Sequence, residues 1–296
     1  MNWIVWATIG YFFNAVAVTV DKALLSRQRL DNPAVYTFAI SCLGLLALFL
    51  VPFGWEWPTP MGWVYGFIAG TAFTGGLWCL FTVLKTSEAS RVPAYIGSLN
   101  PLFVFAISYF ALGERLAVAH FVAFLVLVLG GFMMVGGRGG LGGRALGLAT
   151  LSSALFGVAF VALKLVFGEG TFITGLVVTR LGGFASSLFL LAVPGTWAAF
   201  RHSASNEHHR LKFSFLGGQV AGAAAAFLNS YSVSLASVTL VEALQGIQYV
   251  FVLVFAVLVS WQWPALFREE FSRGVLVRKL TGTALIMGGL WFLSFS

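Results

Sequence analysis

The chain has 296 residues, of which 59% are hydrophobic and 9% are charged, and its formal net charge is +7. Soluble domains carry about 25% charged residues, and even large ones expose much of their surface, so this composition excludes a water-soluble protein and indicates a polytopic membrane protein. No basic cluster is interleaved with polar residues as in a nucleic-acid site, so the positive charge is typical of loop ends and not of a nucleic-acid partner.

Apolar runs long enough to cross a bilayer recur along the whole chain. A bilayer core of about 30 Å needs about 20 apolar residues in a helix, and ten such runs are separated by charged residues, proline or glycine. We therefore expect an all-α polytopic membrane protein with ten transmembrane helices, at residues 3–25, 33–52, 62–84, 91–112, 117–136, 145–167, 171–193, 212–234, 237–261 and 275–295. The first run lacks the basic segment and cleavage site of a signal peptide, so we expect it to be retained.

The second half of the chain repeats the first at a nearly constant offset. Residues 66–90 align without gaps with residues 213–237, so that Gly70 meets Gly217. Further upstream, Lys22 meets Lys164. These matches predict a duplication, because they keep the same order along the chain.

The duplication predicts three parts: a first five-helix repeat at 1–137, a glycine-rich linker at 138–144 and a second five-helix repeat at 145–296. Since five is an odd number of crossings, the second repeat enters the membrane inverted. Inverted repeats are typical of secondary transporters, which bind substrate between the halves near the bilayer midplane. A duplicated bundle could also form a channel or a lipid-handling enzyme.

Residues 88–135 carry a pattern of a known family. Asn100-Pro101 lies in the fourth run, Leu112-Gly113-Glu114 follows as a corner, and Gly130-Gly131 lies in the fifth run. This stretch resembles the end of an EamA-type repeat of the drug/metabolite transporter superfamily. The resemblance implies ten helices, a central cavity lined mainly by helices 1–4 and 6–9, and export, uptake or exchange of small metabolites. The second half departs from the pattern, since Gln248 stands opposite Pro101 and "WQWPALFREEFS" replaces the Leu-Gly-Glu corner.

Arg180 lies near the middle of the seventh apolar run. An Arg at the centre of a membrane helix costs about 2.5–3.5 kcal/mol on insertion scales, and Arg180 is too far from either end of its run to snorkel to a headgroup. Guanidinium keeps its proton and offers a planar fork to carboxylate or phosphate. We expect Arg180 to anchor an anionic group of the substrate; the alternative is a buried partner for a carboxylate or for helix carbonyls.

Glu242, Gln245 and Gln248 follow one another at helical spacing in the ninth run. Unsatisfied polar groups are expensive in lipid, so this stripe faces protein or a cavity. Either it lines the substrate cavity or it makes polar contacts between helices, and Glu242 could pair with Arg180. By the repeat alignment, Glu242 corresponds to Tyr95.

The remaining candidate substrate-binding residues lie in the first, third and fourth runs. Proline leaves an upstream carbonyl without its donor, so the SLNPL segment could bend the fourth helix. The candidates are Asn14, Trp78, Tyr95, Ser98 and Asn100. For proton coupling, the carboxylates to consider are Asp21, Glu88 and Glu242.

Other motifs in the sequence do not indicate a cofactor site, a metal site or an obligatory dimer. The GRGGLG segment from Gly137 lacks the strand and helix of a dinucleotide site, and no Walker motif or catalytic constellation occurs, so we expect no cofactor and no enzymatic activity. His202, His208 and His209 share a polar loop without completing a metal site. The GxxxG steps at Gly66/Gly70 and Gly218/Gly222 permit a homodimer, but packing within one chain explains them equally and a monomer suffices for transport.

Lys and Arg are concentrated in the loops after odd-numbered spans, whereas the other loops and both tails hold little beyond Arg115. The positive-inside rule then places both termini outside the cytoplasm, against the usual orientation of the family.

The sequence thus predicts a multi-pass protein of the cell (inner) membrane. We expect it to be a secondary transporter of a small polar, anion-bearing metabolite that works by alternating access. The alternative is a membrane-embedded lipid-handling protein or enzyme acting at the bilayer interface.

Overall fold

The computed structural model describes residues 2–25, 32–86, 91–134, 142–193, 195–197, 199–200, 209–262 and 273–295. Every regular element in these ranges is a helix. In chain order they are α1 (Asn2–Leu25), α2 (Pro33–Gly44), η1 (Leu45–Phe53), α3 (Pro60–Thr86), α4 (Arg91–Ala111), α5 (Val118–Met134), α6 (Gly143–Gly168), α7 (Phe172–Leu188), η2 (Phe189–Ala192), α9 (His209–Leu235), α10 (Val238–Ala243), α11 (Gly246–Gln262) and α12 (Arg273–Phe295). The expectation of an all-α fold is confirmed for the described residues.

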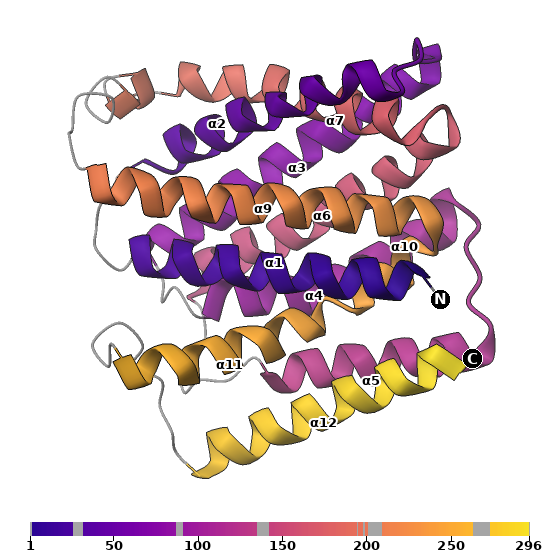
Figure 1. Ribbon diagram of the computed structural model, residues 1–296, viewed down its shortest axis with the longest axis vertical. Coiled ribbons are helices and arrows are strands. Elements are labelled where there is room, and N and C mark those ends of the chain that lie inside the picture. The colour runs from indigo at the N-terminus through magenta and orange to yellow at the C-terminus, as the bar shows by residue number, and fades with distance from the viewer. Residues whose placement is uncertain are drawn as a thin grey trace.

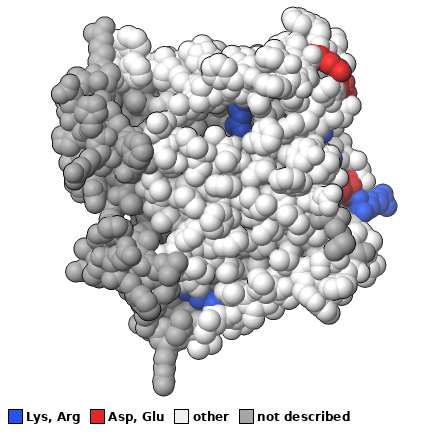
Figure 2. All heavy atoms as spheres, in the orientation of Figure 1, with Lys and Arg blue, Asp and Glu red and all other residues white. Residues whose placement is uncertain are grey.

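The helices have the length and composition of membrane spans. Six described segments are long and apolar enough to cross a bilayer, and two shorter apolar helices occupy Tyr95–Ala111 and Val118–Met133. Many large apolar side chains face outward, among them Phe49 at 75% exposure and Phe110 at 84%. Figure 2 shows a face that is almost free of charged atoms. Such a surface requires lipid as its solvent, so the chain is a multi-pass membrane protein.

Three of the expected spans are not single α-helices. The span at 171–193 ends in the 3₁₀-helix η2, which follows α7 after Leu188. The span that begins at Pro33 continues beyond Gly44 as the 3₁₀-helix η1, which contains Pro52. The span at 237–261 is divided into α10 and α11, because the backbone amides of Gln245, Ile247 and Gln248 each bond the carbonyl three residues earlier, at 2.9–3.0 Å. This tight turn interrupts the α-helical ladder in the middle of the span.

The helices pack side by side in one bundle (Figure 1). The α3 helix packs against α6 and α7, α1 against α9 and α11, and α4 against α6. At one edge of the bundle α5 packs against α12, and at the opposite edge α2 packs against α7. The largest apolar core lies between α1, α4, α5, α10, α11 and α12 and includes Tyr11, Phe124, Leu127 and Leu244.

Glycine permits a close backbone contact between α3 and α7. A Cβ atom on Gly70 would collide with the backbone of Thr179 and Gly183, and a Cβ on Gly182 would lie 2.7 Å from the Cα of Phe67. The hydroxyl of Thr74 donates to the carbonyl oxygen of Gly183 at 3.1 Å. Small residues are what allow membrane helices to approach this closely, so the GxxxG step at Gly66/Gly70 has a packing role within the chain.

Both termini lie at the same end of the bundle (Figure 1). Trp3 at the start of α1 and Ser294 at the end of α12 line one pocket together with the corner after α4 and the turn between α9 and α10. An even number of crossings brings the two ends of a chain to one side of a membrane.

Candidate functional site

A buried polar cluster joins α4 to the break between α10 and α11. The amide nitrogen Nδ2 of Asn100 donates to Oε2 of Glu242 at 2.8 Å and to Oε1 of Gln245 at 3.3 Å. Asn100 and Glu242 are each only 2% exposed. The cluster therefore connects two segments that are 142 residues apart in the chain.

The α1 helix adds two more polar contacts to the same region. Nδ2 of Asn14 donates to Oε1 of Gln248 at 2.9 Å, and the hydroxyl of Tyr11 donates to the carbonyl oxygen of Val241 at 2.9 Å. Gln248 is 3% exposed and Tyr11 is 2% exposed. The polar stripe of the ninth span thus faces away from lipid, as expected, and its members contact α1 and α4.

Local sequence explains why the cluster can form. Gly97 lies one turn before Asn100, and a Cβ atom there would collide with the hydroxyl of Tyr249 and lie 2.9 Å from Nε2 of Gln245. Pro101 lies inside α4 and has no N–H, so the carbonyl of Gly97 loses its usual helical donor. The Oδ1 atom of Asn100 is buried and has no hydrogen-bond partner. The carbonyl of Gly97 and Oδ1 of Asn100 are therefore two hydrogen-bond acceptors of α4 within one turn of each other.

Arg180 lies in the middle of α7, away from this cluster. Its guanidinium carbon is 5.6 Å from the centroid of the Phe73 ring on α3, and a Cβ on Gly44 of α2 would lie 3.4 Å from its Cδ. The side chain is partly exposed, and among the described residues no carboxylate forms an ion pair with it.

The candidate residues predicted from the sequence do not all lie in one place. Asn14, Asn100, Glu242, Gln245 and Gln248 are brought together, as described above. Arg180 is not paired with Glu242, since its contacts lie on α2 and α3.

The other candidates lie apart from the cluster or outside the described set. Tyr95 forms a 3.2 Å hydrogen bond with Thr150 on α6, Ser98 is 3% exposed, and Trp78 is 38% exposed. Glu88, His202 and His208 lie outside the described residues, as does most of the 138–144 linker, and nothing is described of the side chains of Asp21 and His209.

Sequence reasoning missed a second polar region, at the end of the bundle that holds the termini. The ammonium of Lys164 on α6 donates to the carbonyl oxygens of Val233 and Ala236 at 2.8 Å each and of Ser234 at 3.3 Å. It therefore caps the C-terminal end of α9, where a cation is favourable. The repeat alignment pairs Lys164 with Lys22. It gives no information about the carbonyl acceptors of Lys164, because these lie about 70 residues away in the chain.

Glu114 of the Leu-Gly-Glu corner also belongs to this region. Gly113 has a φ of +63°, a left-handed conformation that glycine adopts without strain. The turn directs Glu114 toward α10, where the hydroxyl of Thr239 donates to Oε2 of Glu114 at 2.7 Å. Thr239 also shares a 2.8 Å hydrogen bond with Ser108 of α4, so the corner is tied to the start of α10.

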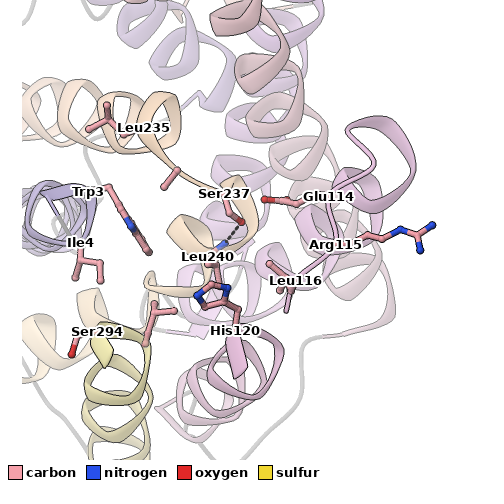
Figure 3. A pocket seen from close by; sticks show the side chains of 12 residues that line it. Trp3, Ile4, Glu114, Arg115, Leu116, His120, Leu235, Ser237, Leu240 and Ser294 are labelled. Atoms are coloured by element: carbon pink, nitrogen blue, oxygen red, sulfur yellow. Dashed lines mark hydrogen bonds between the residues drawn. The ribbon is translucent and has the colours of Figure 1, made fainter. Parts of the chain in front are cut away.

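A pocket of about 440 Å³ opens beside these groups. Figure 3 shows Trp3, His120 and Glu114 around it, whereas Arg115 points away. Its lining also includes Leu240, two residues before Glu242. Within the described part of the chain, no group of three or more His, Cys, Asp or Glu side chains is placed to hold a metal ion.

The fold and the buried polar cluster define an all-helical, multi-pass membrane protein with ionisable groups inside its spans, where such groups mark transport pathways. The model of the EamA-like transporter family matches residues 1–136. The expected resemblance to EamA-type proteins of the drug/metabolite transporter superfamily is thereby confirmed, and the proteins of that family are transporters.

Nearly the whole chain shares its fold with a solved protein. One solved crystal structure superposes on this chain with a TM-score of 0.65 and 19% sequence identity. The superposition covers 98% of this chain and 96% of that one. This likeness concerns the fold alone. No curated protein matches the sequence.

Proposed function

We propose that this protein is a secondary transporter of a small polar, anion-bearing metabolite. It works by alternating access through a cavity between two inverted five-helix repeats, residues 1–137 and 145–296, and Arg180 holds the anionic group of the substrate. The protein lies in the cell inner membrane, with both termini outside the cytoplasm. One chain is sufficient for transport.

The pattern of helix packing supports the inverted repeat. If the repeats are exchanged, α1 takes the place of α6, α3 that of α9, α4 that of α11 and α5 that of α12. The contact of α3 with α6 then becomes that of α9 with α1, and the contact of α4 with α6 becomes that of α11 with α1. All four contacts are present, and α5 packs against its own counterpart, α12.

One pair of contacts departs from this symmetry, and the departure supports alternating access. The α3 helix packs tightly on α7 through Gly70, but the counterpart contact between α9 and α2 is sparse. One of the few links described there is a 3.3 Å hydrogen bond from Nε2 of Gln219 to the hydroxyl of Tyr36. Gly217, the counterpart of Gly70, would meet nothing within 4 Å if it carried a Cβ. We interpret this as one of two states, closed between α3 and α7 and open between α2 and α9.

The observation that carries the substrate class is the guanidinium of Arg180, which has no ion pair among the described residues. A permanent charge in the middle of a span is expensive unless water or an anion compensates it. The side chain of Arg180 is partly exposed, and the Phe73 ring covers one side of the guanidinium. A carboxylate or phosphate would take the remaining hydrogen bonds of the planar fork.

The test begins with a ligand screen. The purified protein is screened by thermal shift against amino acids, sugar phosphates, nucleotides and choline-like cations, and the ligands that raise the melting temperature are tested for transport in proteoliposomes. We expect anion-bearing ligands among the hits. Arg180→Ala should fold and insert but weaken their binding about tenfold to a hundredfold, because a hydrogen bond to a charged group contributes about 1.5–3 kcal/mol.

The matched control is Arg144→Ala, which removes an exposed guanidinium in the first turn of α6. This variant should bind and transport like the unaltered protein. If Arg180→Ala transports with unchanged kinetics, Arg180 is not part of the site. If cations alone stabilise the protein, the anionic substrate class is wrong.

A further inference from the structure

We propose that Glu242, Asn100 and Gln245 form the binding site for a monovalent coupling cation, Na⁺ or H⁺, at the junction of the two halves of the protein. This inference rests on the proposed function of secondary transport and assigns Glu242 to the coupling cation instead of the substrate. The driving ion and the substrate then occupy separate places, since Arg180 contacts α2 and α3.

The geometry of the three side chains supports such a site. They come from opposite halves of the chain, and Nδ2 of Asn100 lies within 2.8 Å of Glu242 and 3.3 Å of Gln245. Asn100 and Glu242 are almost completely buried. A carboxylate in this position is held in place by a neutral amide, which leaves its charge unbalanced.

No described cation balances that charge. The titratable groups near Glu242 are Tyr11 from α1, whose hydroxyl donates to the carbonyl of Val241, and Tyr249 from α11, and neither side chain can carry a positive charge. Lys164 is occupied by the carbonyls at the end of α9, and the contacts of Arg180 lie on other helices. An isolated carboxylate in a low-dielectric interior costs several kcal/mol or more, so a bound cation is required to hold it there.

Uncharged oxygen atoms complete the site. Oδ1 of Asn100 is buried without a partner, and Oε1 of Gln245 accepts only a long bond of 3.3 Å. Pro101 leaves the carbonyl of Gly97, one turn before Asn100, without its helical donor, and the helical ladder of the facing segment is broken between α10 and α11. Interrupted membrane helices whose carbonyl ends meet near the bilayer midplane are where transporters hold Na⁺ or H⁺.

The position of the site links cation binding to the movement of the two halves of the protein relative to each other. Glu242 and Gln245 belong to the second half and Asn100 to the first, so a cation bound among them stabilises the contact between α4 and the α10–α11 break. Leu240 lines the 440 Å³ pocket at the end with the termini, and the hydroxyl of Tyr11 binds the carbonyl of Val241, the residue between Leu240 and Glu242 in the chain. Separation of α1 from α10 would open a path between the pocket and the site.

The experiment measures cation binding directly, without a known substrate. The melting temperature of the purified full chain is recorded while NaCl replaces choline chloride at constant ionic strength and pH, and then while pH is varied without Na⁺. We expect the melting temperature to rise with Na⁺ in the first series if the cation is Na⁺, or to rise as pH falls in the second series if it is H⁺, because ligand binding to the native state stabilises it. The series that responds identifies the ion.

Glu242→Gln keeps the shape of the side chain and should abolish the response. Glu169→Gln is the matched control, since the Glu169 carboxylate accepts a 2.7 Å hydrogen bond from Thr59 at an exposed position, and it should respond like the unaltered protein. Asn100→Ala removes the unpartnered Oδ1 and should shift the response to higher cation concentration. If the unaltered protein responds in neither series, or Glu242→Gln responds equally, the inference is wrong.

Failure of the inference can be separated from failure of the proposed function. Arg180→Ala should keep the cation response, because Arg180 is not part of this site. Transport that depends on Arg180 but shows no cation response would overturn the coupling site and leave the transporter assignment standing. A cation response that Glu242→Gln removes would support the site even when no transported substrate is found.

Discussion

The ammonium of Lys164 lies 2.8 Å from the carbonyl oxygen of Ala236, at the point where α9 ends and the turn into α10 begins. With the carbonyls of Val233 and Ser234, it satisfies three backbone acceptors that the end of a helix leaves open. Since Lys164 belongs to α6, a single side chain holds the α9–α10 corner against α6. This corner in turn carries α10, whose last turn contains Glu242.

We expect Lys164→Met to destabilise the protein by about 1–3 kcal/mol, because it leaves buried carbonyl groups without a donor. The measurement is a thermal melt of the purified variant in detergent. Arg115→Met is the control, since its guanidinium lies over the Tyr109 ring at the exposed surface and its loss should change the melting temperature little. Equal melting temperatures for the two variants would mean that the bonds from Lys164 do not stabilise the corner.

Gly70 and Gly217 occupy corresponding positions in the two repeats but have different surroundings. We expect Gly70→Val to destabilise the protein by about 1–3 kcal/mol or more, because its side chain collides with the backbone of α7. Gly217→Val should melt like the unaltered protein, because a Cβ there meets nothing within 4 Å.

The same pair tests alternating access. If the opening between α2 and α9 closes during transport, Gly217→Val should fold normally yet transport more slowly, since the added methyl groups obstruct closure. Transport by this variant is compared with that of the unaltered protein in proteoliposomes. Normal transport would show that α9 does not approach α2 at Gly217.

Much of the fold could be predicted from the sequence, because lipid imposes strong rules. The expected all-α membrane fold is confirmed for the described residues, and six described segments are long and apolar enough to span a bilayer, since runs of about 20 apolar residues have few alternatives there. The burial of Glu242 and Gln248 followed from the same reasoning, because polar groups in an apolar helix turn away from lipid.

The partners within the polar cluster could not be predicted. The hydrogen bond from Asn100 to Glu242 joins residues 142 apart, and sequence periodicity carries no information about such contacts. Tyr95 aligns with Glu242 in the repeat, yet its hydroxyl bonds Thr150, because α4 packs on α6. The break between α10 and α11 was also missed, since no proline marks it.

Glu114 and Glu169 provide a matched test of burial. Each carboxylate accepts a 2.7 Å hydrogen bond from a threonine, Thr239 for Glu114 and Thr59 for Glu169, but the first bond is partly buried and the second is exposed. We expect Glu114→Ala to lower stability by about 1–3 kcal/mol and Glu169→Ala by less than about 1 kcal/mol, as judged by chemical or thermal unfolding. An equal effect of the two substitutions would contradict a structural role for the Leu-Gly-Glu corner.

Arg180→Lys tests the kind of recognition and not merely the charge. Lysine keeps the positive charge but loses the planar fork, so a carboxylate or phosphate that binds through two parallel hydrogen bonds should bind about tenfold more weakly, whereas Arg180→Ala should bind weaker still. Affinity is measured by thermal shift or isothermal titration with whichever anion stabilises the protein, and Arg144→Lys serves as the control. If Arg180→Lys binds as tightly as the unaltered protein, the guanidinium acts as a point charge; if Arg180→Ala does as well, the substrate anion binds elsewhere. A graded loss from Arg to Lys to Ala, with the cation response of the protein unchanged, is the result that assigns the anion to α7 and the coupling ion to the α10–α11 break.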